Sequence, residues 1–278
     1  MKQQKFALVT GAAGGLGAAT VQELVTNGWF VFAADLADAA QAPRTDAPNI
    51  FRVTMDVCDR ESIDHAFTEV SDRTKSLDAV VNFAGIHALA SMIEIDEADF
   101  KRVMDINLFG TFRVNQRFFE LLHAAKGRIV NISSETGWQS AGPFNGPYAI
   151  SKHAIEAYSD ALRRELALLD VSVIKVQPGP FRTSMVKGLG ETFERAANKS
   201  RYFRHVLMGV QPLAAREAES AAPAVVLAKA VVAALQSNRP RAAYSVRPNR
   251  MRAALDSLPT PIVDRIWNTT LRRLGKQK

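Results

Sequence analysis

Short apolar runs alternate with longer segments of helical periodicity along the first two thirds of the chain. The apolar runs that predict strands cover residues 6–10, 29–34, 50–55, 77–83, 128–132 and 171–176. Apolar residues at helical spacing predict helices between them, including 60–75, 99–126 and 148–169. Strands that are apolar throughout, each followed by a helix, are typical of a parallel sheet covered by helices on both faces. The pattern therefore predicts a doubly wound α/β fold. With no internal repeat and no low-complexity linker, we expect one domain over residues 1–278.

A glycine-rich turn, residues 11–17, follows the first predicted strand, and the helix after it is predicted to end at Asn27-Gly28. Glycines let the backbone approach a pyrophosphate closely, and the helix N-terminus offers free N–H groups. The second strand ends at Asp35, where a ribose would lie. These features predict a Rossmann-type dinucleotide site. The alternative is a plain turn, in which glycines are also common.

Polar and glycine residues gather where the predicted strands end. They are Gly11 to Gly17, Asp35, Asp56, residues 82–85, Ser134 and residues 178–183. In such a sheet, ligands bind outside the carboxyl ends of the strands, so we expect these residues to share one site. Asp56 could instead cap the helix that begins near Arg60, and Ser133 and Ser134 could be ordinary turn formers.

Tyr148 and Lys152 are four residues apart in a predicted helix and therefore project from the same face, one turn apart. A free tyrosine is a poor base near neutrality because its pKa is about 10. A fixed positive charge beside the phenol favours the phenolate, so we expect Lys152 to lower the pKa of Tyr148. Alone, this spacing is also a common accident on helices.

Composition restricts the function classes. Of 278 residues, 47% are hydrophobic and 23% charged, as in an ordinary globular domain. The single cysteine, Cys58, excludes an internal disulfide and fits a reducing compartment. No apolar run is long enough for a membrane span, and the N-terminus lacks the apolar region of a secretory signal, so we expect a cytoplasmic protein. One cysteine and five scattered histidines predict no metal site.

Residues 239–278 carry ten Lys or Arg and two Asp, a balance of +8, which leaves −1 for the rest of a chain whose net charge is +7. No nucleic-acid motif accompanies this charge, so we expect no nucleic-acid partner. Apolar residues within 262–274 predict an amphipathic basic helix. It could lie on a membrane surface, or pack on its own domain or a partner subunit. We favour packing, because Pro259 and Pro261 are typical of an ordinary helix start.

Taken together, the motifs closely resemble the short-chain dehydrogenase/reductase family over residues 5–190. Thr10-Gly11-x-x-x-Gly15-x-Gly17 matches its cofactor turn, and Asn82-Phe83-Ala84-Gly85 matches its Asn-Asn-Ala-Gly element except at Phe83. Asn107, Ser134, Tyr148 and Lys152 match its catalytic residues, and Pro178-Gly179 with Thr183 matches its Pro-Gly-x-x-x-Thr. Ser134 lies fourteen residues before Tyr148, one more than expected, so Ser133 is an alternative.

The resemblance implies an oxidoreductase in which Tyr148 transfers the alcohol proton, Lys152 lowers its pKa and holds the nicotinamide ribose, Ser134 binds the substrate oxygen and Asn107 holds a water. The implied cofactor-binding residues are Thr10, Gly11, Ala13, Gly14, Gly15, Leu16, Gly17, Asp35, Asp56, Val57, Asn82, Ala84, Gly85, Tyr148, Lys152, Pro178, Gly179, Phe181 and Thr183. Asp35 predicts NAD over NADP, because its carboxylate would repel a 2′-phosphate. Neither Gly15 nor Leu36 is basic, and Arg44 is the nearest downstream cation. The resemblance also implies a homodimer or homotetramer built on helices 99–126 and 148–169.

The substrate is predicted to be an apolar alcohol or ketone, because no cluster of charge converges on the site. The predicted pocket wall, a lid over about 181–210, contains Phe181, Met185, Val186, Leu189, Phe193, Tyr202, Phe203, Val206, Leu207 and Met208. The opposite loop is 137–147, and its residues 142–147 resemble the branch that contains retinol and hydroxysteroid dehydrogenases. Two other functions stay open: a non-catalytic dinucleotide sensor, and a sugar-nucleotide epimerase, which would need a larger C-terminal domain.

Overall fold

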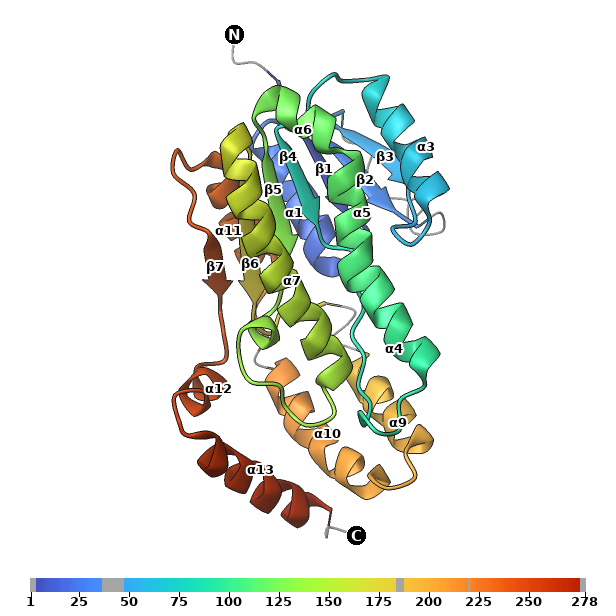
Figure 1. The fold of residues 1–278 in the computed structure, drawn as a ribbon, viewed down its shortest axis with the longest axis vertical. Helices are drawn as coiled ribbons and strands as arrows, with labels where there is room; N and C mark the ends of the chain where they lie inside the picture. The colour runs from blue at the N-terminus through green and yellow to red at the C-terminus, as the bar shows by residue number, and fades with distance from the viewer. Residues whose placement is uncertain (1–3, 37–47, 184–187, 220, 276–278) are drawn as a thin grey trace.

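A computed structural model of the chain describes residues 4–36, 48–183, 188–219 and 221–275. Seven strands form one parallel sheet in the order β3-β2-β1-β4-β5-β6-β7 (Figure 1). Their bounds are β1 Lys5–Thr10, β2 Trp29–Asp35, β3 Ile50–Thr54, β4 Ala79–Asn82, β5 Arg128–Ile132, β6 Ser172–Pro178 and β7 Ala243–Val246. The order reverses at β1, as in Rossmann-type folds, so the predicted fold class is confirmed. The edge strand β7 was not predicted, because four residues of mixed polarity give no periodic signal.

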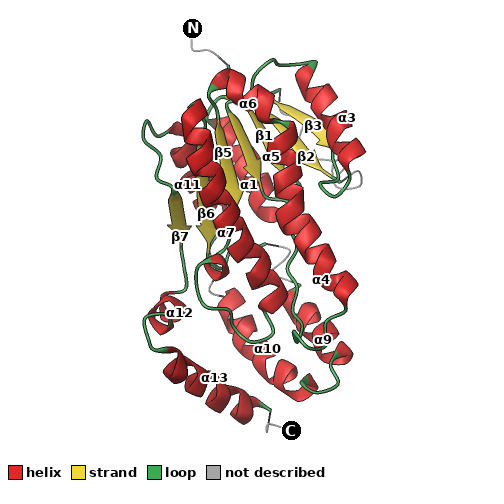
Figure 2. Cartoon of the chain, in the orientation of Figure 1, coloured by secondary structure: helices red, strands yellow, loops and turns green. Residues whose placement is uncertain are grey.

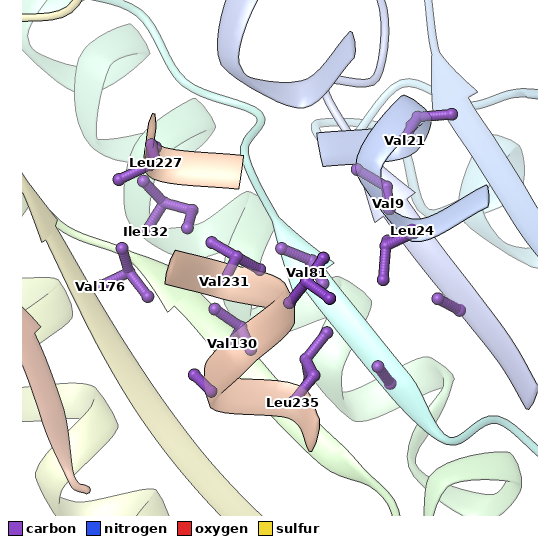
Figure 3. Close-up of a cluster of buried hydrophobic side chains, with 14 of the residues drawn as sticks. Val9, Val21, Leu24, Val81, Val130, Ile132, Val176, Leu227, Val231 and Leu235 are labelled. Carbon is purple, nitrogen blue, oxygen red and sulfur yellow. The ribbon is translucent and has the colours of Figure 1, made fainter. Parts of the chain in front are cut away.

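Helices cover both faces of the sheet. α1 (Gly15–Thr26) and α11 (Ala224–Gln236) pack on one face, where Val9, Val81 and Val130 meet Leu24 and Val231 (Figure 3). The opposite face carries α3 (Arg60–Ser71), α5 (Thr111–Arg117), α6 (Phe119–Ala125) and α7 (Gly146–Leu166). Leu8, Val80 and Ile129 point to that second face, since consecutive side chains alternate along a strand. This explains why the strands are apolar throughout.

The predicted helix over 99–126 is a composite. It consists of α4 (Glu97–Met104), a π-helical turn η1 (Asp105–Gly110), α5 and α6. A Cβ on Gly110 would lie only 2.7 Å from Cγ2 of Val57, so this turn passes very close to the loop after β3. π-helical turns are frequent at functional sites, and this one contains Asn107. The predicted helix over 148–169 is α7, followed by a 3-10 turn, η3 (Ala167–Leu169).

Four further helices lie beyond the carboxyl ends of the strands: α9 (Leu189–Lys199), α10 (Arg204–Glu219), α12 (Arg250–Leu255) and α13 (Thr260–Leu274) (Figures 1 and 2). The predicted basic helix is α13, with a proline at its start as expected. It packs along α10, where Leu274 contacts Gly209 and Trp267 lies beside Gly142. Of the alternatives for the tail, the structure has packing on its own domain. Among the described residues, no helix combines the length and apolarity that crossing a membrane requires.

Candidate active site

A cleft of about 1940 Å³ runs along the carboxyl ends of the strands and continues between α9, α10, α12 and α13. The predicted site residues that line it are Thr10, Gly11, Ala13, Gly14, Gly15, Leu16, Gly17, Asp35, Asp56, Val57, Ala84, Gly85, Ser134, Tyr148, Lys152, Pro178, Gly179, Phe181 and Thr183. The fold thus brings together segments that are up to 173 residues apart in the chain. Asn82 and Asn107 lie behind the cleft wall.

The glycine turn is packed too tightly for side chains. Gly11 has φ of +63°, and a Cβ there would lie 2.7 Å from the amide nitrogen of Ala84. A Cβ on Gly17 would collide with the carbonyl oxygen of Gly11, and one on Gly15 would lie 3.0 Å from Cγ2 of Thr183. Gly14 provides no side-chain cap for α1, so the first-turn N–H groups are available to an anionic ligand. This cradle fits the pyrophosphate of a dinucleotide.

Asp35 is held beside this cradle. Its carboxylate accepts hydrogen bonds from the N–H of Ala13 at 2.6 Å and of Leu36 at 2.8 Å. The two main-chain donors fix the orientation of this carboxylate. Asp35 therefore presents a negative group at the end of β2, where the sequence places the adenosine ribose.

Asp56 does not cap α3. The N-cap is Asp59, whose side chain accepts a hydrogen bond from the N–H of Glu61 at 3.0 Å. Asp56 instead accepts from the N–H of Cys58 at 2.8 Å and lines the cleft together with Val57. Of its two readings from sequence, the helix-cap alternative is wrong, and a ligand-facing position fits the structure.

Tyr148 and Lys152 lie one turn apart on α7, with Nζ of Lys152 5.6 Å from the centre of the Tyr148 ring. Lys152 is buried and donates a hydrogen bond to the carbonyl oxygen of Ile132 at 2.9 Å. Ser134 hydrogen-bonds to Tyr148. Ser133 instead lies against the α7 backbone, with its hydroxyl 3.5 Å from the carbonyl oxygen of Lys152. The geometry therefore selects Ser134 as the serine that meets the tyrosine.

The electrostatics of this pair differ from the sequence-based expectation. Burial raises the pKa of Tyr148 to about 12; the hydrogen bond from Ser134 opposes this and the Glu135 charge adds to it. Burial lowers the pKa of Lys152 to about 8, against an opposing effect of Glu156. The expected lowering of the Tyr148 pKa is therefore not found: the net shift is upward, because burial disfavours the charged phenolate. Tyr148 carries its proton at neutral pH.

The side chains of two predicted site residues, Asn82 and Asn107, lie behind the wall of the cleft. The Asn82 side chain, predicted to bind cofactor, points into the core and donates to Oδ1 of Asn115 at 2.8 Å and of Asn131 at 3.0 Å. Asn107 donates to the Ser151 hydroxyl at 2.9 Å and exchanges two hydrogen bonds with the main chain of Ile86. Its side chain therefore positions the loop after β4 and helix α7.

Sequence reasoning missed three groups in the cleft. The His87 ring packs against Tyr148 with centroids 4.7 Å apart. The Glu135 side chain is buried, and its Oε2 accepts a hydrogen bond from the N–H of Asn249 at 2.5 Å. Arg252 lies 3.9 Å from Oε1 of Glu135. The sequence could have indicated His87 as a site residue, because it lies just past the end of β4. Glu135 and Arg252 are 117 residues apart, so no pattern in the sequence indicated that they would pair.

The predicted substrate wall is partly different in the structure. Phe181, Leu189 and Phe193 line the cleft. Phe203 and Leu207 pack inside the lid, whereas Tyr202 and Met208 are exposed and Val206 contacts Gly275 at the end of α13. Met185 and Val186 fall outside the described residues. Of the opposite loop, residues 142–145 line the cleft as expected. Across the described ranges, no group of three or more His, Cys, Asp or Glu side chains is arranged to hold a metal ion.

Comparison with known proteins agrees with this geometry. The sequence model of a family described as "short chain dehydrogenase" matches residues 5–194. Similar proteins include the "NADPH-dependent 3-dehydrocapnine reductase" of Ornithobacterium rhinotracheale, 27% identical over 98% of this chain and 99% of that one. "Retinol dehydrogenase 7" of Mus musculus is 36% identical over 66% of this chain, which spans 58% of that relative's length. A short chain dehydrogenase from Burkholderia cenocepacia, solved in complex with NADP, shares the fold with a TM-score of 0.71. It is 23% identical, over 95% of this chain and 98% of that one.

Proposed function

The chain belongs to the short-chain dehydrogenase family, and we propose that it interconverts an apolar secondary alcohol and its ketone. The observation that supports this most is the meeting of Ser134, Tyr148 and Lys152 beside a glycine cradle that fits a dinucleotide. A nicotinamide dinucleotide, when bound, supplies or accepts the hydride. Absorbance at 340 nm, followed with both cofactors over apolar secondary alcohols, their ketones, retinoids and hydroxysteroids, tests the proposal. No turnover across that panel would contradict it.

The residues of this chain would hold the substrate and move its proton. Ser134 and Tyr148 share a hydrogen bond, so both hydroxyls can reach one substrate oxygen and stabilise the charge that develops there. Tyr148 would exchange the proton with that oxygen as general acid or base. Lys152 would hold the nicotinamide ribose. Asn107 would position α7 through Ser151, whose hydroxyl also donates to the carbonyl oxygen of Tyr148 at 2.7 Å.

The raised pKa of Tyr148 supports ketone reduction at neutral pH. A phenol whose pKa is about 12 is protonated at pH 7 and can donate its proton to a ketone oxygen. Alcohol oxidation needs the phenolate, so it would gain as pH rises. We therefore propose that the ratio of oxidation to reduction rates increases with pH.

For the cofactor, we propose a preference for NAD. Asp35 supports it, because two main-chain N–H groups fix a carboxylate where NADP would place its 2′-phosphate. Among described cleft residues before Asp59, none is Lys or Arg. Arg44 falls outside the described residues. The NADPH dependence named for the Ornithobacterium relative favours the opposite choice. Measuring catalytic efficiency with both cofactors decides between them.

For the substrate, the apolar character of the cleft beyond Tyr148 supports a hydrocarbon-rich molecule, such as a retinoid or a steroid. The mouse relative is named for retinol. A non-catalytic sensor is less well supported, because it would need neither Ser134 beside Tyr148 nor Lys152. An epimerase of the same superfamily is disfavoured because α9, α10, α12 and α13 cover the cleft without forming a separate sugar-nucleotide domain.

We also propose a homo-oligomer built on α7. Its exposed side carries Ile150, Ala157, Ala161 and, in η3, Leu168, an apolar strip that a second copy could cover. Ile155 and Leu166 of the same helix are buried in the chain's own core and do not belong to this strip. The lone Cys58 supports a reducing compartment such as the cytoplasm, which fractionation of cells would test.

Peripheral membrane contact by the tail stays a proposal. α13 exposes Ile262 and Ile266 beside Arg265, and its last turn exposes Arg272 and Arg273. This mixture suits a surface of anionic lipid. Flotation with liposomes of phosphatidylcholine and phosphatidylserine tests it, and absence of the protein from the lipid fraction at low salt would contradict it.

A further inference from the structure

The C-terminal segment reaches the cleft that contains Tyr148. The part of the chain that matches the family ends at residue 194, yet α12 contributes Met251 and Leu255 to the cleft wall. From α13, Trp267 and Leu271 line the same cleft. The tail is therefore part of the wall of the candidate active site, in addition to being packed on the domain.

Three contacts hold this segment against the loop that carries Ser134. The N–H of Asn249 donates to the buried carboxylate of Glu135, the residue after Ser134. Farther along, the N–H of Ser140 donates to Oδ1 of Asp256 at 2.9 Å. A Cβ on Gly142 would lie 3.8 Å from the ring of Trp267, which is van der Waals contact. The tail and the serine loop thus form one continuous wall.

The wall is polar near the reacting hydroxyls and mainly apolar along α10, α12 and α13, where Arg216 and Arg252 also line the cleft. Ser134, His87 and Glu135 surround Tyr148. On the side facing α12 and α13, α9 contributes Phe193 and α10 contributes Val210, Leu213 and Ala214. The serine loop adds Phe144. A drug-sized ligand occupies a pocket of roughly 300–1,000 Å³, so a cleft of about 1940 Å³ has room for a dinucleotide and a second extended ligand.

We propose that the groove between α10 and α13 binds the hydrocarbon chain of a long-chain alcohol or ketone, whose oxygen lies at Tyr148. This inference rests on the proposed function and names its substrate class. A flexible chain can follow the groove from the serine loop to Leu271. Each methylene that leaves water should raise kcat/KM by roughly two- to four-fold until the groove is filled.

The test is a series of 2-alkanones from four to twelve carbons, followed at 340 nm with the preferred reduced cofactor. In the wild type, we expect kcat/KM to rise by at least about 100-fold across the series. Leu271→Arg places a charge in the groove and should reduce the ratio between the twelve- and four-carbon ketones at least about tenfold. Ile266→Arg makes a similar change on the outer face of α13, which does not line the cleft, and should leave that ratio within about twofold.

Two further measurements separate the possible failures. Melting temperature and fluorescence titration with reduced cofactor show whether each variant is folded. If Leu271→Arg is not folded, Ala214→Trp can replace it, because it narrows the groove from α10 and should lower the twelve- to four-carbon ratio in the same way. Calorimetric titration with 2-dodecanone reports chain binding without turnover. Tight, Leu271-dependent binding with no turnover would contradict the proposed function alone. Turnover with a flat series, or turnover of a rigid steroid ketone only, would overturn the groove assignment.

Discussion

The ring of His87 packs edge-on against the ring of Tyr148, with centroids 4.7 Å apart and planes inclined by 61°. Burial lowers the pKa of His87 to about 4, although a hydrogen bond with Asn145 opposes the shift and the charge of Arg252 adds to it. His87 is therefore neutral at physiological pH. A neutral imidazole this close to Tyr148 can hydrogen-bond to a ligand in the cleft without repelling a cationic one.

His87 should make the protein less stable in mild acid. Unfolded, its pKa returns to 6.5, so between pH 6.5 and about 4 the unfolded chain binds more protons. The free energy of unfolding should fall as pH decreases through that window, by at most about 1.4 kcal/mol per pH unit from this group. In urea titrations, His87→Gln should remove part of this slope. His65→Gln, at an exposed position, should retain it. Equal slopes in all three proteins would contradict the assignment.

Tyr148→Phe should abolish proton transfer and leave the cleft intact. The ring still packs against His87, so cofactor affinity should change little, while turnover should fall by ~10²-fold or more, as for loss of a general acid. Steady-state kinetics and cofactor fluorescence titration measure the two effects. Lys152→Ala should also weaken cofactor binding. Turnover within a few-fold of wild type in Tyr148→Phe would remove Tyr148 from the mechanism.

The two adjacent serines should behave differently. Ser134→Ala deletes the hydroxyl that meets Tyr148 and should lower kcat by about 10- to 100-fold, since it removes a donor to the developing charge. Ser133→Ala removes only a hydroxyl that lies against the α7 backbone, so kcat should stay within about threefold. The pair serve as controls for each other, and the reverse ranking would assign the role to Ser133.

The choice of cofactor should depend on Asp35. Asp35→Ala with Leu36→Arg removes the carboxylate and adds a cation for a 2′-phosphate, so the ratio of kcat/KM for NAD to that for NADP should fall or invert. Equal efficiencies with both cofactors in the wild type, or no shift in the double variant, would show that Asp35 does not determine the choice.

A dimer in solution should depend on the exposed strip of α7. We expect light scattering at micromolar concentration to give at least a dimer mass. Ala157→Arg, in the middle of the strip, should shift that mass toward the monomer by inserting bulk and charge. An Arg substitution at His65 on α3, outside the strip, is the matched control. A monomer mass for the wild type would refute the proposal.

The sequence alone determined what depends on short-range patterning. Strand apolarity, helix period and turn glycines predicted the parallel sheet. The spacing of Tyr148 and Lys152 placed them on one helical face. The shared position of the polar and glycine residues at one edge follows from topology, because all parallel strands present their carboxyl ends to that edge. These predictions succeeded because each rests on a periodicity or a backbone constraint within about 30 residues.

Tertiary structure decided everything that depends on which segments meet and how much water they exclude. Only packing turned Asn82 into the core, aimed Ser134 and not Ser133 at Tyr148, and joined Glu135 to Asn249 across 114 residues. The direction of the Tyr148 pKa shift also depends on the tertiary structure. Spacing implied a lowered value, but desolvation by distant segments raises it, and a side chain's solvation is not encoded in its sequence neighbours.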